Sequence, residues 1–267
     1  MRPKLFFDTD VCNAVEDGKI PPAEWERVLS HVYENYAYQV SAITLKEIFG
    51  GLARSPDASF EKNKSRLKAI CQLKPKQFLP YPAFFVMQTI LGLKNTVRRV
   101  FPPYPSEEVL YEKVCEGLLS GLSKKEIKTK LDFDLDHFDD HENIPQNKFA
   151  DINQGLRDGR VEKFDPLKIA RNLITDCREE PDEESCRKVV VALDAALTFS
   201  KQLSYQANNQ QFNFKKHHTD WGDMMQLYYL CDESMRFVTL DRKCKSKANG
   251  STQMSRILLY KEFLETM

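Results

Sequence analysis

The stretch of sequence that decides the fold is Lys4-Leu5-Phe6-Phe7-Asp8-Thr9-Asp10-Val11. Its apolar run, residues 5–7, is too short for a helix and ends abruptly at acidic residues. A short apolar run closed by polar residues is typical of a buried parallel strand. Ligands of open α/β sheets bind beyond the carboxyl ends of such strands. We therefore expect a strand here, with Asp8 in the place of a functional carboxylate.

The same pattern recurs late in the chain, where the sequence is Arg236-Phe237-Val238-Thr239-Leu240-Asp241. This segment predicts a second strand that ends in an acid. Residues 38–43 predict a further strand, and residues 257–260 predict a last short one. Strands of this kind that alternate with helical patterns indicate the α/β class with a parallel sheet.

Two more acids are expected in the first turns of helices. Thr44 is expected to cap one helix, and Glu47 follows three residues later, at the spacing of a capping box. Asp220 is expected to cap another helix, with Asp223 in its first turn. The capping box alone would explain Glu47. The alternative is that Glu47 lies at the same sheet edge as Asp8, and both interpretations stay open.

The middle of the chain has a different sequence pattern. Residues 56–215 carry mainly helical patterns, and we expect them to form a helical insertion or cap on an α/β core made of residues 1–55 and 216–267. The expected helices are 60–73, 82–100, 106–120, 123–138, 166–177 and 183–206.

Composition limits the class of protein. The chain has 267 residues, which suits one large domain or one domain with an insertion. Its 39 basic and 39 acidic residues give no net charge, so nucleic-acid binding would need local basic patches. Seven scattered cysteines without a C-x-x-C motif suggest a reduced, cytoplasmic protein. No apolar run approaches the length of a membrane span, and we expect no membrane association.

The four acids in matched positions are Asp8, Glu47, Asp223 and Asp241. In a parallel α/β sheet, the carboxyl ends of strands and the first turns of the following helices lie at one edge. Four carboxylates gathered there repel one another, which raises their pKa values or destabilises the fold unless a cation is present. Oxygen-only clusters suit Mg²⁺ or Mn²⁺, and such ions activate water in phosphodiester hydrolysis.

A basic segment follows the last of these acids. Its cations are Arg242, Lys243, Lys245 and Lys247, with no acid among them. Beside an acidic metal centre, such a flank could hold the backbone of a polyanionic substrate. The alternative is an ordinary charged loop, and the sequence does not separate the two.

At this point the arrangement resembles the PIN-domain nucleases. The resemblance covers residues 1–55 and 216–267 and rests on the order and local spacing of short motifs. The matching motifs are Leu5-Phe6-Phe7-Asp8-Thr9-Asp10-Val11, Ser41-Ala42-Ile43-Thr44-Leu45-Lys46-Glu47-Ile48-Phe49-Gly50-Gly51-Leu52, Asp223-Met224-Met225-Gln226-Leu227 and Phe237-Val238-Thr239-Leu240-Asp241.

The resemblance implies a three-layer α/β/α core and a metal-dependent endoribonuclease with Mg²⁺ or Mn²⁺. The implied metal-binding catalytic acids are Asp8, Glu47, Asp223 and Asp241. Thr239 would support the site by hydrogen bonding. Asp10 would be an additional metal-site acid or merely a cap, and Asp220 is a rival to Asp223. The implied substrate is single-stranded or looped RNA, whose backbone can be splayed into a narrow site.

Other functions stay open. Asp8-Thr9-Asp10-Val11 also fits the opening motif of haloacid-dehalogenase-like phosphatases, with Asp8 as nucleophile and Asp10 as acid/base. A further alternative is a non-catalytic RNA- or protein-binding module on a degenerate nuclease core. A nuclease of this type could also act in a toxin–antitoxin pair, with a protein partner or inhibitor, and assembly into a homo-oligomer is left open.

Overall fold

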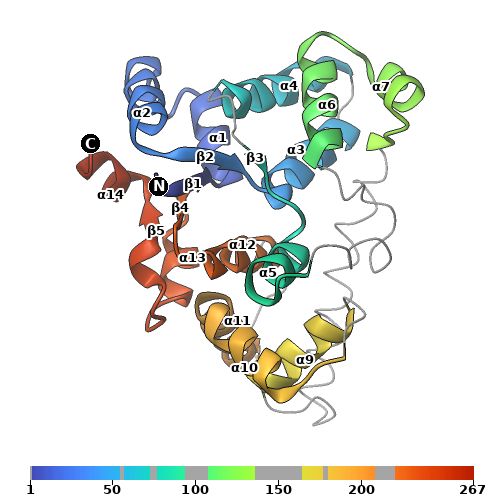
Figure 1. The fold of residues 1–267 in the computed structure, drawn as a ribbon. Coiled ribbons are helices and arrows are strands. Elements are labelled where there is room, and N and C mark those ends of the chain that lie inside the picture. Colours follow the sequence, from blue (N-terminus) through green and yellow to red (C-terminus); the bar gives the residue numbers. More distant parts are fainter. Residues whose placement is uncertain are drawn as a thin grey trace.

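The computed structural model describes residues 2–54, 57–72, 77–93, 108–135, 164–176, 180–207 and 220–267. A five-stranded sheet lies at its centre, with helices on both faces (Figure 1). The strand order is β3-β2-β1-β4-β5, and all of the pairings are parallel. The strands are β1 (Lys4–Phe7), β2 (Ala37–Val40), β3 (Gln77–Phe78), β4 (Met235–Thr239) and β5 (Ile257–Leu259). The expected α/β class is thus confirmed.

The central strand β1 joins segments that lie far apart in the sequence. It pairs with β2 on one side and with β4 on the other, in a register that sets Phe7 beside Val238. The Asp8 N–H extends this ladder by donating to the Val238 carbonyl at 2.9 Å. Because β1 and β4 are parallel, Asp8 and Asp241 leave the sheet at the same edge.

One face of the sheet packs against the first of two hydrophobic cores. Leu5 and Phe7 point into this core, where they meet Trp25 and Val28. Alternate residues of a strand face opposite sides, so Phe6 points the other way. The helices that contribute to this core are α1 (Thr9–Glu16), α2 (Pro22–Asn35), α3 (Ala42–Arg54), α4 (Asp57–Cys71), α6 (Glu108–Leu119), α7 (Lys124–Leu131) and α14 (Tyr260–Glu265).

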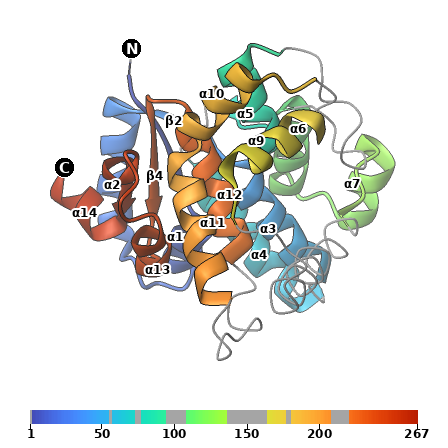
Figure 2. The same ribbon diagram turned by 90° about the horizontal axis from the view of Figure 1, so that it is seen from below.

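The opposite face carries the second core. Here Phe6 stacks on Phe237, with 4.9 Å between ring centroids, and meets the edge of Tyr229 at 5.4 Å. Figure 2 shows α9, α10 and α11 in front, with α12 behind them. The elements of this face are α5 (Pro82–Leu91), α9 (Pro166–Asp176), α10 (Glu183–Ala192), α11 (Asp194–Ala207), α12 (Asp220–Gln226), η5 (Leu227–Cys231), α13 (Arg242–Lys247) and η6 (Met254–Arg256).

The segment expected to be a helical insertion contributes to the central sheet. Gln77–Phe78 forms β3 and pairs with β2, and the preceding helix α4 packs against α1 and α3 (Ala42–Arg54). The expected boundary at residues 55 and 56 is therefore not where the sheet layer ends. Among the described ranges, no helix is both long and apolar enough to cross a membrane.

Several expected element boundaries are wrong, for local reasons. The strand expected at 38–43 ends at Val40, because α3 already begins at Ala42. The helix expected at 82–100 ends at Leu91, where Gly92 adopts a left-handed φ of 68° that ends a helix. The helix expected at 123–138 ends before Asp132, at φ 52°. The helix expected at 183–206 is two helices that meet at Leu193.

Candidate functional site

Asp8 is anchored where β1 ends and α1 begins. Its Oδ1 accepts a hydrogen bond from the Thr9 N–H at 2.8 Å, so it caps α1. Its Oδ2 accepts from the Thr239 hydroxyl, also at 2.8 Å. The residue is only 6% exposed. These contacts fix the carboxylate at the carboxyl edge of the sheet, where the sequence predicted it.

The Thr239 hydroxyl joins the ends of the two central strands. It donates to Asp8 and accepts from the Asp241 N–H at 2.9 Å. Asp241 in turn caps α13, because its Oδ1 accepts from the Lys243 N–H at 2.7 Å. One buried hydroxyl therefore sets the spacing between the acid after β1 and the acid after β4. The supporting role expected of Thr239 agrees with this geometry.

Asp10 lies in the first turn of α1 and contacts the turn that follows β4. Its two carboxylate oxygens lie 3.2 and 3.1 Å from the Leu240 N–H, in the turn between β4 and α13. Oδ2 also lies 3.4 Å from the Thr239 hydroxyl. Burial raises the pKa of Asp10, the Leu240 N–H lowers it, and the charge of Asp241 raises it. The expectation that Asp10 is a helix cap is wrong, because Asp8 caps α1 and Asp241 caps α13. The role of Asp10 as an additional metal-site acid stays a prediction.

Glu47 reaches the site from α3, but not through the expected capping box. Ser41 caps this helix instead, since its hydroxyl accepts from the Thr44 N–H at 3.0 Å. Thr44 lies inside the helix and donates to the Phe7 carbonyl at 3.2 Å. Glu47 is exposed and lies beyond the first turn. A Cβ added at Gly222 would stand 3.0 Å from Glu47 Oε1, so α12 approaches Glu47 closely.

The two rival acids of α12 have different surroundings. Asp220 is the first residue of the helix, and its carboxylate pairs with the Lys247 ammonium at 2.5 Å. Asp223 follows three residues later and is partly exposed. The expectation that Asp220 precedes the helix as its cap is therefore wrong. The buried ion pair explains its position better, because both side chains are less than one tenth exposed.

The four expected acids share one electrostatic environment. Burial raises the pKa of Asp8 well above its usual value, and the charges of Asp10, Glu47 and Asp223 raise it further. Burial also raises the pKa of Asp223 to about 8, with further contributions from Asp241 and Glu47. Groups perturb one another in this way only when they lie close together in a poorly solvated place. The structure thus brings together acids from β1, α3, α12 and β4.

Two residues that the sequence analysis missed complete the surroundings. Gln226 is buried and links α12 to α3: its Oε1 accepts from the Ser41 hydroxyl at 2.7 Å, and its Nε2 donates to the Thr44 hydroxyl at 3.1 Å. A polar residue inside the apolar run of this helix was the available signal. Cys244 lies buried beside the acids, and burial and their charges raise its thiol pKa. No pattern in the sequence indicated that position.

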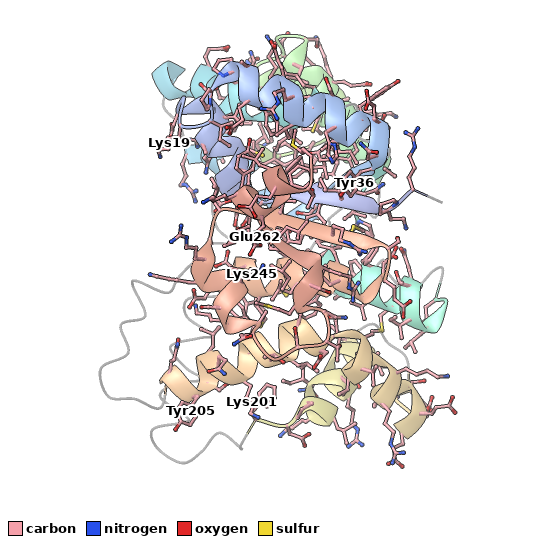
Figure 3. All side chains as sticks on the ribbon, turned by 90° about the vertical axis from the view of Figure 1, so that its left-hand side faces the viewer. Lys19, Tyr36, Lys201, Tyr205, Lys245 and Glu262 are labelled. Atoms are coloured by element: carbon pink, nitrogen blue, oxygen red, sulfur yellow. The ribbon has the colours of Figure 1, made fainter. Side chains whose placement is uncertain are left out.

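Only part of the expected basic flank lies at the surface. Arg242 and Lys243 are exposed. Lys245 forms an ion pair with Glu262 of α14 at 2.5 Å. Both residues are labelled in Figure 3. Lys247 is buried against Asp220 and is not placed to contact a phosphate. The flank therefore offers a substrate two exposed cations instead of the expected four.

The donor chemistry fits a hard divalent cation. Asp8, Glu47, Asp223 and Asp241 offer only carboxylate oxygens, the ligands that Mg²⁺ and Mn²⁺ prefer. Within the described ranges, however, no three acidic, histidine or cysteine side chains converge closely enough to hold a metal ion. Ion binding would therefore need a movement of these side chains. Comparisons with protein-family models, with curated proteins and with solved structures gave no match for this chain.

Proposed function

We propose that this chain is a metal-dependent endoribonuclease of the PIN type. In this proposal, Asp8, Glu47, Asp223 and Asp241 hold Mg²⁺ or Mn²⁺ and hydrolyse RNA phosphodiester bonds. The supporting observation is that burial and the charges of neighbouring acids raise the pKa values of Asp8 and Asp223. Buried carboxylates that repel one another are costly, and a divalent cation would relieve that cost.

The surrounding residues suit this chemistry. A divalent cation, when bound, would activate water and stabilise the leaving oxygen. Thr239 and the Thr9 N–H hold the two oxygens of Asp8 in fixed positions, which preserves the shape of the pocket between reactions. Arg242 and Lys243 lie exposed just after Asp241, where they would attract phosphates. The preference for RNA over DNA rests on the resemblance alone.

One observation weighs against the phosphatase alternative. The acid/base role would need Asp10 to face the substrate, whereas both of its oxygens contact the Leu240 N–H. All four acids are present in the sequence, which weighs against a degenerate binding module.

The experiment that tests the proposal compares three substrates. Labelled single-stranded RNA, the same sequence as DNA and p-nitrophenyl phosphate are each incubated with Mn²⁺ or with EDTA. We expect cleavage of RNA with Mn²⁺, no cleavage with EDTA, and loss of cleavage in Asp8→Asn. Glu233→Gln is the matched control, because Glu233 is an exposed acid just before β4, at the opposite end of that strand.

Each outcome has a defined meaning. RNA cleavage that persists in Asp8→Asn would overturn the assignment of the site. Turnover of p-nitrophenyl phosphate without RNA cleavage would favour the phosphatase. Binding of RNA without either activity would favour the non-catalytic module.

A further inference from the structure

A buried ion pair lies near Asp223, one of the proposed cation ligands. Lys247 of α13 and Asp220 of α12 lie 2.5 Å apart, and their side chains are 7% and 9% exposed. The Lys247 ammonium also stands 4.9 Å from the centre of the Phe199 ring of α11. One cation therefore connects three helices on the same face of the sheet.

Separating the two charges of this buried pair requires a large input of free energy. A buried ammonium loses its hydration, and a carboxylate and an aromatic face compensate it only while they stay in place. Removal of one partner leaves the other as an uncompensated buried charge. The carboxylate of Asp220 is consequently committed to Lys247 in the folded protein.

The charges of the pair also affect Asp223. Residues three apart on a helix lie on the same side, so Asp220 and Asp223 are neighbours on α12. The negative charge of Asp220 raises the pKa of Asp223, and the positive charge of Lys247 lowers it. Without Lys247, Asp220 would be one more negative charge beside acids that already repel one another.

We infer that Lys247 is a positioning residue that neutralises Asp220 and leaves Asp223 as the acid through which α12 contributes to a divalent-cation site. This inference rests on the proposed function, and it decides between the two acids that the sequence left as rivals. Asp220 then holds α12 against α13, and only Asp223 faces the cation. The Lys247 ammonium supplies the positive charge beside Asp220, so that Asp220 needs no metal ion.

The first arm of the test measures thermal unfolding without metal. We expect Lys247→Met and Asp220→Asn each to lower Tm by several degrees, on the order of 5 °C, because each leaves one buried charge without its partner. The double variant Asp220→Asn/Lys247→Met should recover most of this loss, because no buried charge remains. Lys243→Met is the matched control, since Lys243 is an exposed lysine on the same helix, and it should leave Tm unchanged.

The second arm measures Mn²⁺ binding by the rise in Tm and by calorimetric titration. The wild type and Asp220→Asn/Lys247→Met should bind Mn²⁺ with similar affinity, whereas Asp223→Asn should bind at least about tenfold more weakly. Lys247→Met frees Asp220, so Mn²⁺ should raise its Tm more than that of the wild type. Lys247→Arg keeps the charge and should restore the wild-type response to Mn²⁺, which a purely structural role for the lysine would not require.

The outcomes separate this inference from the proposed function. If the double variant loses Mn²⁺ binding and Asp223→Asn keeps it, Asp220 is the ligand and the inference is overturned, while the metal-dependent nuclease stands. If the Tm loss of the double variant equals the sum of the losses of the two single variants, Asp220 and Lys247 are not coupled. The inference then fails, while the proposed function stands. If the wild type does not respond to Mn²⁺, the metal site is wrong, and both the proposed function and the assignment of Asp223 fall with it.

Discussion

Thr239 shows how much of the site depends on a single hydroxyl. It is fully buried, donates to Asp8 and accepts from the Asp241 N–H. Thr239→Val keeps the shape but leaves both partners unpaired, so we expect a loss of about 1–3 kcal/mol in the free energy of unfolding. Urea denaturation measures this loss, and Thr239→Ser, which keeps the hydroxyl, should recover most of it. Equal stability of the two variants would contradict the bridging role.

Asp223 gives the protein a specific pH dependence. Its pKa is raised from 3.8 to about 8 in the folded state, first by burial and then by Asp241 and Glu47. The folded state thus keeps this proton in a range where the unfolded state has lost it. The unfolded state binds fewer protons there, so the free energy of unfolding should fall as pH rises from about 4 to about 8.

The measurement is the Tm of the metal-free protein across that pH range. Asp223→Asn should flatten the decline, because the variant has no proton to lose at this position. Added Mn²⁺ should restore stability most strongly at the upper end, where the carboxylate is charged. A slope that is the same in Asp223→Asn and in the wild type would contradict the role of Asp223.

At the scale of the elements, the approach of α12 to α3 is set by a glycine. A Cβ at position 222 would stand 3.0 Å from Glu47 Oε1 and 3.9 Å from Ile43. Gly222→Ala should stabilise the helix itself by about 0.5–1 kcal/mol. We expect it to displace the exposed Glu47 carboxylate and thereby weaken Mn²⁺ binding and activity without a loss of Tm. Gly250→Ala is a contrasting control, because Gly250 has φ +92° and open space around it, so the cost there is one of backbone strain.

The strands were predictable from the sequence because their signal is local. The apolar run that ends at Asp8 gives β1, and the run at 236–240 gives β4 to within one residue at each end. Both are short, buried and closed by polar residues, so no distant contact is needed to recognise them. β3 escaped prediction because a pair of residues, Gln77–Phe78, carries no detectable period.

The start of α3 and the role of Lys247 could not be predicted for a different reason. Ser41 and Thr44 are both good N-cap residues, and the choice depends on the Thr44 hydroxyl donating to the Phe7 carbonyl, a contact between elements. Lys247 follows other lysines and so has the pattern of a surface residue. Its true partner, Asp220, comes from another helix, and the packing of α13 on α12 brings them together.

At the scale of the whole molecule, charge balance bears on the proposal that the protein binds RNA. The chain has no net charge, and Arg242 and Lys243 are the exposed cations of the segment after Asp241. If they contact phosphates, Arg242→Ala/Lys243→Ala should weaken RNA binding and reduce the slope of log K against log salt by about 0.7 per lost contact. A salt titration of RNA binding measures that slope. Arg27→Ala, at an exposed arginine of α2 on the other face, should leave it unchanged.

The position of β1 between β2 and β4 has a consequence for the biosynthesis of the protein. Asp8 is translated well before its neighbours Val238 and Thr239, which follow more than two hundred residues later. Until then β1 has an open edge, and the acids of β1 and α3 lack their counterparts on α12 and β4. Closing so long a loop is slow. The nascent chain therefore carries only the acids of β1 and α3 while the ribosome is still reading the message, and the full set of acids comes together only after α12 and β4 have been made.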